Sequence, residues 1–291
     1  MIADLFTIIA PVLIASGIGF GWGRFGGRFD VEFVTALVTS VGAPCLIFHT
    51  LANLSVGTDE FLSMVGAGLV VISISAGFGT IVLRAFRLSV PAFLPSLMFA
   101  NTGNMGLPLS SLAFGEAGLA LAIGIFALSA VLQFTAGVAI SSGRLSFRML
   151  ARVPLLYALP PALVFMFTGA TPPAWLNATT ELIGTMTIPL MLITLGVSLA
   201  KLAVASLPRS LGLSTLRLLL GFVLGLGVAH LFGLQEVARG VLIVQSSMPV
   251  AVFNYLFAQR YRRAPEEVAG LVVISTVLSF LTLPLLLWFV L

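Results

Sequence analysis

The chain has 291 residues, of which 59% are hydrophobic and 8% are charged, and its mean hydropathy is +1.16. Soluble globular domains carry about 25% charged residues, so this composition excludes an ordinary soluble protein and predicts an all-α polytopic membrane protein. The net charge of +4 is spread between apolar runs and forms no basic and aromatic cluster, which excludes a nucleic-acid-binding protein.

Ten apolar runs are long enough to span a hydrocarbon core of about 30 Å. They lie at 4–22, 31–54, 60–83, 90–115, 117–141, 149–169, 175–199, 210–233, 235–259 and 266–290. The first run has no basic residue before it, which is atypical of a cleaved signal peptide, so we expect it to be retained as the first span.

Charged residues in the loops predict the orientation of these ten spans. The basic residues follow the odd-numbered spans: Arg24, Arg28, Arg84, Arg87, Arg144, Arg148, Arg152, Lys201, Arg209, Arg217, Arg260, Arg262 and Arg263. On the other side lie Asp4, Asp59, Glu60, Glu116 and Glu236, with Arg239. Because cytoplasmic loops are enriched in Lys and Arg, we expect a bacterial inner-membrane protein with both termini outside the cytoplasm.

The two halves of the chain contain similar segments in the same order. The matching prolines are Pro11 with Pro161, Pro44 with Pro189, and Pro108 with Pro249, and the fifth and tenth spans begin with EAGLALAIG and EVAGLVVIS. Five spans per half would give the halves opposite orientations. The sequence therefore predicts an inverted five-plus-five repeat, with one repeat at 1–141 and the other at 149–291.

The fourth and ninth spans are interrupted by poor helix formers. Pro108 and Pro249 each remove a backbone N–H and clash with the preceding turn, and Gly103 and Gly106 weaken the fourth span further. Backbone groups that are freed inside a bilayer need partners. We therefore expect each span to consist of two half-helices, and the second half-helix of the fourth span to begin after Gly106.

The side chains beside these two breaks are polar and uncharged. They are Asn101, Thr102 and Asn104 in the fourth span, and Gln245, Ser246, Ser247 and Asn254 in the ninth. Each second half-helix presents a positively polarised N-terminus to the membrane interior, which favours an anion. Paired interrupted spans are typical of a transporter's substrate site, so we expect these residues to bind a small organic anion.

The prolines in the second and seventh spans allow two structural interpretations. Pro44 and Pro189 either make ordinary helix kinks or shape the scaffold wall that faces the crossing of the broken spans. Pro11 and Pro161 are interpreted as ordinary kinks. The single cysteine, Cys45, lies in an apolar run and allows no intramolecular disulfide.

The break in the fourth span resembles the signature N-x-G-N-x-G-x-P of the auxin efflux carrier family. The matching residues are Asn101, Gly103, Asn104, Gly106 and Pro108. The ten spans and the break before Pro249 extend this resemblance over nearly the whole chain. By this resemblance, Asn104 is expected to contact the substrate, and Asn101 and Pro108 to shape the crossing.

The resemblance also implies a fold shared with the bile-acid:sodium symporters. Spans 1, 2, 6 and 7 (about 4–54 and 149–199) would form a scaffold, and the remaining spans (about 60–141 and 210–290) a mobile transport domain. It further implies a homodimer joined through the scaffold and an elevator-type movement of organic anions. The short segment SSGRLSFRML between spans five and six is similar to the bacterial branch, for which carboxylates such as malonate or malate are expected.

The sequence predicts no cofactor and no metal site, and leaves the driving force open. His49 and Glu181 are candidates for proton coupling because ionisable groups within spans are functional candidates, with packing and a solvated membrane edge as the alternatives. His230 and Glu116 are expected at the interface and in a loop. Transport driven by the membrane potential and transport coupled to protons are expected equally. Sodium coupling is less expected because the polar residues near the breaks are neutral.

Two other protein classes fit the sequence poorly. An enzyme would need paired acids, a nucleophile with a base, or a metal cluster, but the aspartates lie near span ends and the two histidines are distant from each other. A channel would need a polar stripe along several helices, whereas the polar residues gather at one depth. A sodium-coupled organic-anion symporter of the bile-acid type is the alternative function.

Overall fold

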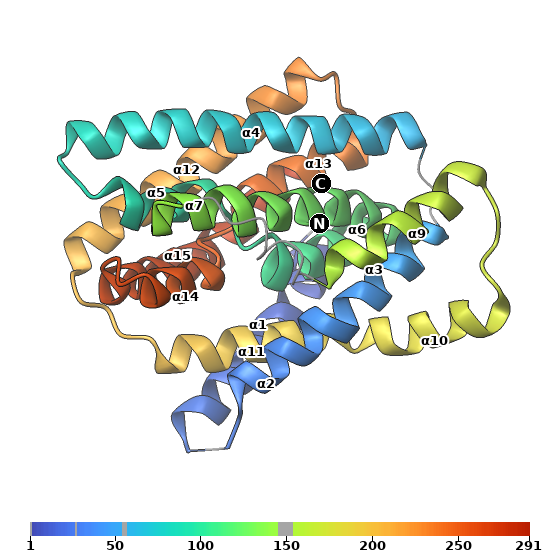
Figure 1. Cartoon of the computed structure of the whole chain (residues 1–291), viewed down its shortest axis with the longest axis horizontal. Coiled ribbons are helices and arrows are strands. Elements are labelled where there is room, and N and C mark those ends of the chain that lie inside the picture. The colour runs from blue at the N-terminus through green and yellow to red at the C-terminus, as the bar shows by residue number, and fades with distance from the viewer. Residues whose placement is uncertain (1, 27, 54–56, 145–153) are drawn as a thin grey trace.

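The computed structural model describes residues 2–26, 28–53, 57–144 and 154–291 (Figure 1). The regular secondary structure of these residues is helical, without a β-strand among them, and seven helices are long and apolar enough to cross a membrane. The seven lie at Leu5–Arg24, Val31–Ala52, Thr58–Ala85, Thr102–Ser142, Ala174–Lys201, Leu207–Leu231 and Pro265–Val290. The expected class, an all-helical membrane protein, is therefore confirmed.

The first half of the chain contains α-helices and short π-helical turns, the latter marked η. They are α1 (Ile2–Arg24), α2 (Val31–Leu37), η1 (Val38–Gly42), α3 (Ala43–Ala52), α4 (Thr58–Ala85), α5 (Val90–Met98), η2 (Thr102–Gly106), α6 (Leu107–Leu132), η3 (Gln133–Gly137) and α7 (Val138–Ser142). The second half contains α9 (Leu155–Thr168), α10 (Ala174–Thr185), α11 (Thr187–Lys201), α12 (Leu207–Leu231), α13 (Glu236–Ser246), α14 (Val252–Arg260) and α15 (Pro265–Val290).

Three of the ten expected spans correspond to shorter or divided helices. The expected span 90–115 falls on α5, η2 and the first turns of α6, and 235–259 falls on α13 and α14. The expected span 149–169 falls on α9, and its first residues, together with Arg148 and Arg152 of the orientation pattern, lie outside the described residues. Ten crossings and the inverted repeat therefore stay predictions, with seven spans supported by helix length.

The long segment Thr102–Ser142 is not one straight helix. Gly115 has φ 66° and ψ −153° within α6, a combination that essentially only glycine adopts. Just beyond it, a Cβ on Gly118 would lie 2.3 Å from Phe114 Cβ and 2.7 Å from Ser110 O, so the two parts of α6 pack directly against each other. This kink separates the region of the expected fourth span from that of the fifth.

We expect Gly115→Ala to lower the free energy of unfolding by about 1–3 kcal/mol, because a Cβ is strained at this backbone conformation. Gly77→Ala is the matched control, since Gly77 lies within α4 with open space around its Cβ position. Thermal unfolding of the purified protein in detergent measures both changes. Equal midpoints for the two variants would show that Gly115 does not require its observed conformation.

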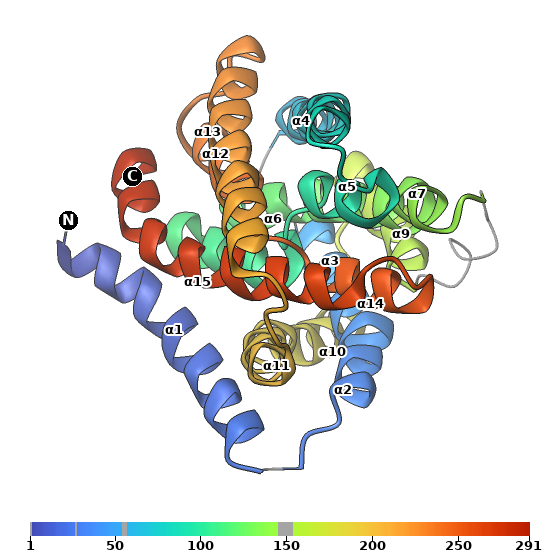
Figure 2. The same ribbon diagram turned by 90° about the vertical axis from the view of Figure 1, so that its left-hand side faces the viewer.

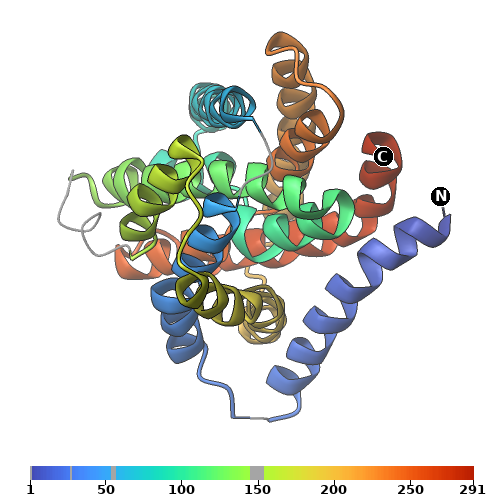
Figure 3. The same ribbon diagram turned by 90° about the vertical axis from the view of Figure 1, so that its right-hand side faces the viewer.

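A first group of helices packs around α11. Helix α1 packs along α11, and Figures 2 and 3 show it at one outer edge of the molecule. A Cβ on Gly19 would lie 2.0 Å from Ile193 O, and one on Gly196 would lie 1.9 Å from Ser16 O. Small residues therefore bring these two backbones into contact, as is common between membrane helices. Nearby, α3 packs against both α9 and α10.

The second group of helices surrounds α6 and α12. Helix α12 packs against α13 and α15, and α6 packs against α4 and α13. This group meets the first where α1 packs against α6 and α15, where α3 packs against α6, and where α11 packs against the turn η2. The division into a scaffold and a transport domain stays a prediction, as does movement of the two groups relative to each other.

Candidate transport site

The two expected helix breaks cross and pair with each other. Helix α5 ends at Met98 and α13 at Ser246, and the extended residues that follow form an antiparallel bridge between Ala100 and Val250. Asn101 N donates to Pro249 O at 2.7 Å, and Ala251 N donates to Phe99 O at 3.3 Å. Backbone groups that the breaks release from helical pairing thus become partners of each other, as a membrane interior requires.

Buried side chains hold this crossing in place. Asn254 donates from Nδ2 to Phe99 O at 3.1 Å and accepts on Oδ1 from Gln133 Nε2 at 2.9 Å. Val250 N donates to Ser275 Oγ at 3.0 Å. Because Gln133 belongs to η3 and Ser275 to α15, these bonds connect the crossing to the helices on both sides of it.

The fourth-span break lies earlier than the sequence predicts. The second half-helix begins at Thr102 rather than after Gly106, because Thr102–Gly106 form a π-helical turn that continues into α6. Gly106 N donates to Asn101 O at 3.0 Å. This bond spans five residues, as in a π-helix, whereas an α-helical bond spans four. Such a turn lets the backbone accommodate Pro108 without a break, and η1 precedes Pro44 in the same way.

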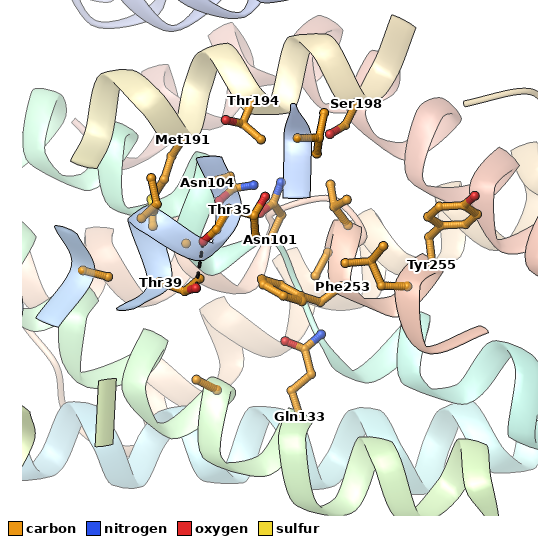
Figure 4. Close-up of a pocket in the computed structure, with 18 of the residues that line it drawn as sticks. Thr35, Thr39, Asn101, Asn104, Gln133, Met191, Thr194, Ser198, Phe253 and Tyr255 are labelled. Carbon is orange, nitrogen blue, oxygen red and sulfur yellow. Dashed lines mark hydrogen bonds between the residues drawn. The ribbon is translucent and has the colours of Figure 1, made fainter. Parts of the chain in front are cut away.

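A cavity of about 670 Å³ lies between the crossing and the first group of helices (Figure 4). The crossing side of its wall comes from the residues around both breaks, Ala100–Asn104 and Ala251–Phe253, and from Gln133. The opposite side comes from α2, η1 and α11. Figure 4 shows the side chains of Asn101 and Asn104 among the residues that line the cavity, together with Thr35 of α2.

The cavity wall contains hydroxyl groups from the first group of helices. Thr35 and Thr39 are four residues apart on α2 and η1, and Thr194 and Ser198 are four residues apart on α11, so each pair shares one helix face. Thr39 Oγ1 donates to Thr35 O at 2.7 Å. Asn101 Nδ2 and Thr194 Oγ1 are buried and have no hydrogen-bond partner among the described residues, so donors remain for the oxygens of a ligand.

The charged residues of the cavity lie at its exposed end. Lys201 and Arg260 are both exposed there, together with Asp30 and Glu32. Lys201 Nζ donates to Phe29 O at 3.3 Å. The interior wall near the breaks is neutral, as the sequence predicts, and the aromatic rings of Phe126, Phe134 and Phe253 add apolar surface.

The predicted ligand residues of the two breaks lie in different places. Asn101, Thr102 and Asn104 line the cavity, together with Gly103. The ninth-span residues Gln245, Ser246, Ser247 and Asn254 are buried away from its wall. Gln245 Nε2 donates to Ser110 Oγ at 3.2 Å, and a Cβ on Gly106 would lie 2.4 Å from Gln245 Oε1. Here the two half-helices are in contact, and a side chain at position 106 would require the Gln245 amide to move.

A second cavity, of about 280 Å³, contains both proton-coupling candidates. It is lined by His49 and Glu181, with Glu116 from the kink region of α6. His49 Nδ1 lies 3.1 Å from Asn177 Oδ1. In the second and seventh spans, the residues that line this cavity come after Pro44 and before Pro189. The residues of these spans that line the larger cavity come before Pro44 and after Pro189. The two cavities therefore lie along opposite ends of the same helices, and neither proline itself is on a cavity wall.

A comparison with protein families identifies the chain. The family of membrane transport proteins matches residues 138–287, about half of the chain. The chain belongs to this family. Auxin efflux carriers are members of it, so the resemblance to that family is confirmed, by a match that lies outside the Asn101–Pro108 signature.

Two archaeal relatives of this membrane transport protein are also named as transporters. An uncharacterized transporter of Methanocaldococcus jannaschii is 24% identical, with 98% of each chain covered. An uncharacterized transporter of Methanothermobacter thermautotrophicus is 26% identical, with 89% of each chain covered. Transport across a membrane is therefore the activity of the family, and the seven long apolar helices fit it.

Sequence reasoning missed two sets of residues in this transporter. The hydroxyl groups of Thr35, Thr39, Thr194 and Ser198 reach the cavity from the first group of helices, and only their spacing of four could have indicated a shared face. The charge pattern predicts Arg217 to be a loop cation, yet its side chain is buried. Its position inside the apolar run 210–233 was the available signal, because charges within spans are usually functional.

Proposed function

We propose that this protein is a carrier of small organic anions, chiefly carboxylates, with the substrate site in the cavity beside the crossing. The observation that supports it most is the crossing itself, where the second half-helices begin at Thr102 and Val252 on the cavity wall. Both N-termini place positively polarised backbone ends beside the same space. Neutral donors such as the amide of Asn104 supplement them.

The shape and polarity of the cavity support a small amphipathic anion. A volume of about 670 Å³ falls within the range of about 300–1,000 Å³ that is usual for small-molecule sites. Phe126, Phe134 and Phe253 offer apolar contact to the body of the ligand, while Lys201 and Arg260 attract anions to the exposed end. Malonate, malate and auxin-like aromatic acids are all compatible with these features.

Alternating access by an elevator movement is the proposed mechanism. The helices around α6 and α12 would carry the crossing past the group around α1 and α11, closing the larger cavity and enlarging the smaller one. Under the positive-inside orientation, the larger cavity with Lys201 and Arg260 faces the cytoplasm of a bacterial inner membrane. The proposal includes a homodimer joined through the first group, with both termini outside. Proton coupling through His49 and Glu181 and potential-driven transport both fit this mechanism.

A sodium-coupled symporter is the alternative, and one observation favours it. Gln245 Oε1 is buried without a hydrogen-bond partner among the described residues, and Ser110 Oγ lies beside the same amide. An unpaired amide oxygen next to a hydroxyl is suitable chemistry for a sodium ligand. Sodium dependence of transport would distinguish this alternative from the proposed carrier.

Reconstitution into liposomes tests the proposed function. Labelled malonate, malate, benzoate and indole-3-acetate are offered in turn while a pH gradient, a sodium gradient or a membrane potential is imposed separately. We expect uptake of at least one carboxylate, increased by an inside-positive potential if no cation is coupled. Folded protein that transports none of the four under any gradient would contradict the proposal.

A further inference from the structure

Arg217 is a buried cation with few partners. It projects from α12, its exposure is 2%, and Nη2 donates to Ser246 O at 3.0 Å. Nε and Nη1 have no hydrogen-bond partner, and no carboxylate forms an ion pair with this guanidinium, within the ranges that the structure describes. The proposed site does not use this residue, and its charge requires an explanation.

An unpaired charge inside a protein is costly. Guanidinium stays protonated in proteins, and burying an ion without a counter-ion costs several kcal/mol. Ser246 is the last residue of α13, so its carbonyl belongs to the negatively polarised end of that helix. This end is equivalent to about half a charge and compensates the guanidinium only in part. A net positive charge therefore remains beside the crossing.

The packing of α12 holds this charge at the break. A Cβ on Gly221 would lie 2.0 Å from Ser246 O, and one on Gly225 would lie 3.0 Å from Ile243 Cα. Arg217, Gly221 and Gly225 follow one another at intervals of four, so a single face of α12 presses against the end of α13. From Ser246 the chain continues directly through Pro249 into Ala251, which lines the larger cavity.

We propose that Arg217 is the fixed counter-charge of the bound carboxylate. It acts as a positioning residue from beside the end of α13, without lining the cavity itself. It supplies the positive charge that a coupling cation would otherwise supply at this crossing, so transport does not require sodium. This inference rests on the proposed function and adds how the site holds its anion: the counter-charge is built into the helices around α6 and α12 and moves with them. Because the protein interior screens charge less than water does, this attraction acts without direct contact.

The sharpest test places a negative charge beside the Arg217 guanidinium and leaves Arg217 itself unchanged. Ser214 precedes Arg217 by three residues on α12 and is fully buried, with its Oγ donating to Leu271 O at 3.3 Å. Ser214→Asp places a carboxylate on the same helix face as the guanidinium, and Ser214→Asn is the control of equal size without charge. We expect the KM for the best-transported carboxylate of the panel to rise about tenfold in S214D relative to S214N, the scale of a charge interaction over several ångströms, with kcat changed less.

Two further measurements complete the test. Arg217→Lys, which keeps the charge, is expected to stay within about threefold of the wild-type KM, whereas Arg217→Met is expected to raise it at least tenfold, in line with the loss of one charge interaction. Wild-type uptake is expected to be unchanged when potassium replaces sodium. Equal KM values for S214D and S214N, a wild-type KM in Arg217→Met, or a sodium requirement would each overturn the inference while leaving carboxylate transport established. Absence of any wild-type uptake would overturn the proposed function as well.

Discussion

Asn104→Asp is expected to abolish carboxylate uptake, and Asn104→Ala to raise the KM about 10- to 100-fold. Asn104 lies on the cavity wall in the first turn of the second half-helix, where its amide can donate to an anionic oxygen. A hydrogen bond to a charged group contributes about 1.5–3 kcal/mol, which gives the range for alanine. Aspartate has the same size as asparagine but repels the anion, so its effect is larger. Initial rates of uptake into proteoliposomes measure both variants.

The matched control for this charge is Gln259→Glu. Gln259 lies on α14, exposed and away from the cavity wall, so the same amide-to-acid change there adds equal charge without touching the site. We expect its uptake to remain within about twofold of wild type because exposed charges are strongly screened. If Asn104→Asp and Gln259→Glu have equal effects, Asn104 does not contact the substrate.

Gly19→Ala is expected to lower the thermal unfolding midpoint by several degrees, whereas Gly17→Ala leaves it nearly unchanged. A Cβ on Gly19 would lie 2.0 Å from Ile193 O, a backbone atom that moves only if α1 and α11 separate. Overpacking of this kind costs about 1–3 kcal/mol. Gly17 is two residues away on the same helix, with open space around its Cβ position. Midpoints are compared for both variants in the same detergent.

This comparison also tests the proposed scaffold. If α1 and α11 form its rigid centre, Gly19→Ala should reduce the fraction of folded transporter more than it changes the KM of the molecules that remain folded. A variant with wild-type stability would show that the two helices are free to separate, and a scaffold of this kind would be ruled out.

The crossing could be predicted from the sequence because its chemistry is local. Pro108 and Pro249 remove helical hydrogen bonds whatever their surroundings, and their matching positions in the two halves indicate which breaks belong together. The antiparallel bridge between Ala100 and Val250 joins these two breaks. The start of the second half-helix was wrong by several residues because a π-turn at Thr102–Gly106 accommodates Pro108, and propensity alone does not predict such a turn.

The opposite wall of the cavity could not be predicted because it depends on helix rotation. Thr35 and Thr194 face the crossing only because α2 and α11 are turned that way in the packed structure. Both helices lie in spans that are apolar over most of their surface, so periodicity does not distinguish the cavity face from the lipid face. Burial of Arg217 likewise depends on Gly221 and Gly225, which allow α12 to approach α13.

The most direct test of the central claim is to locate the bound anion. A structure of the protein determined with a bromine-substituted form of the best-transported carboxylate would show the ligand through its heavy atom. We predict density in the larger cavity, with the carboxylate beside Asn101 and Asn104 and the body of the ligand towards Phe253. A ligand bound at saturating concentration anywhere else, with this cavity unchanged, would contradict the account.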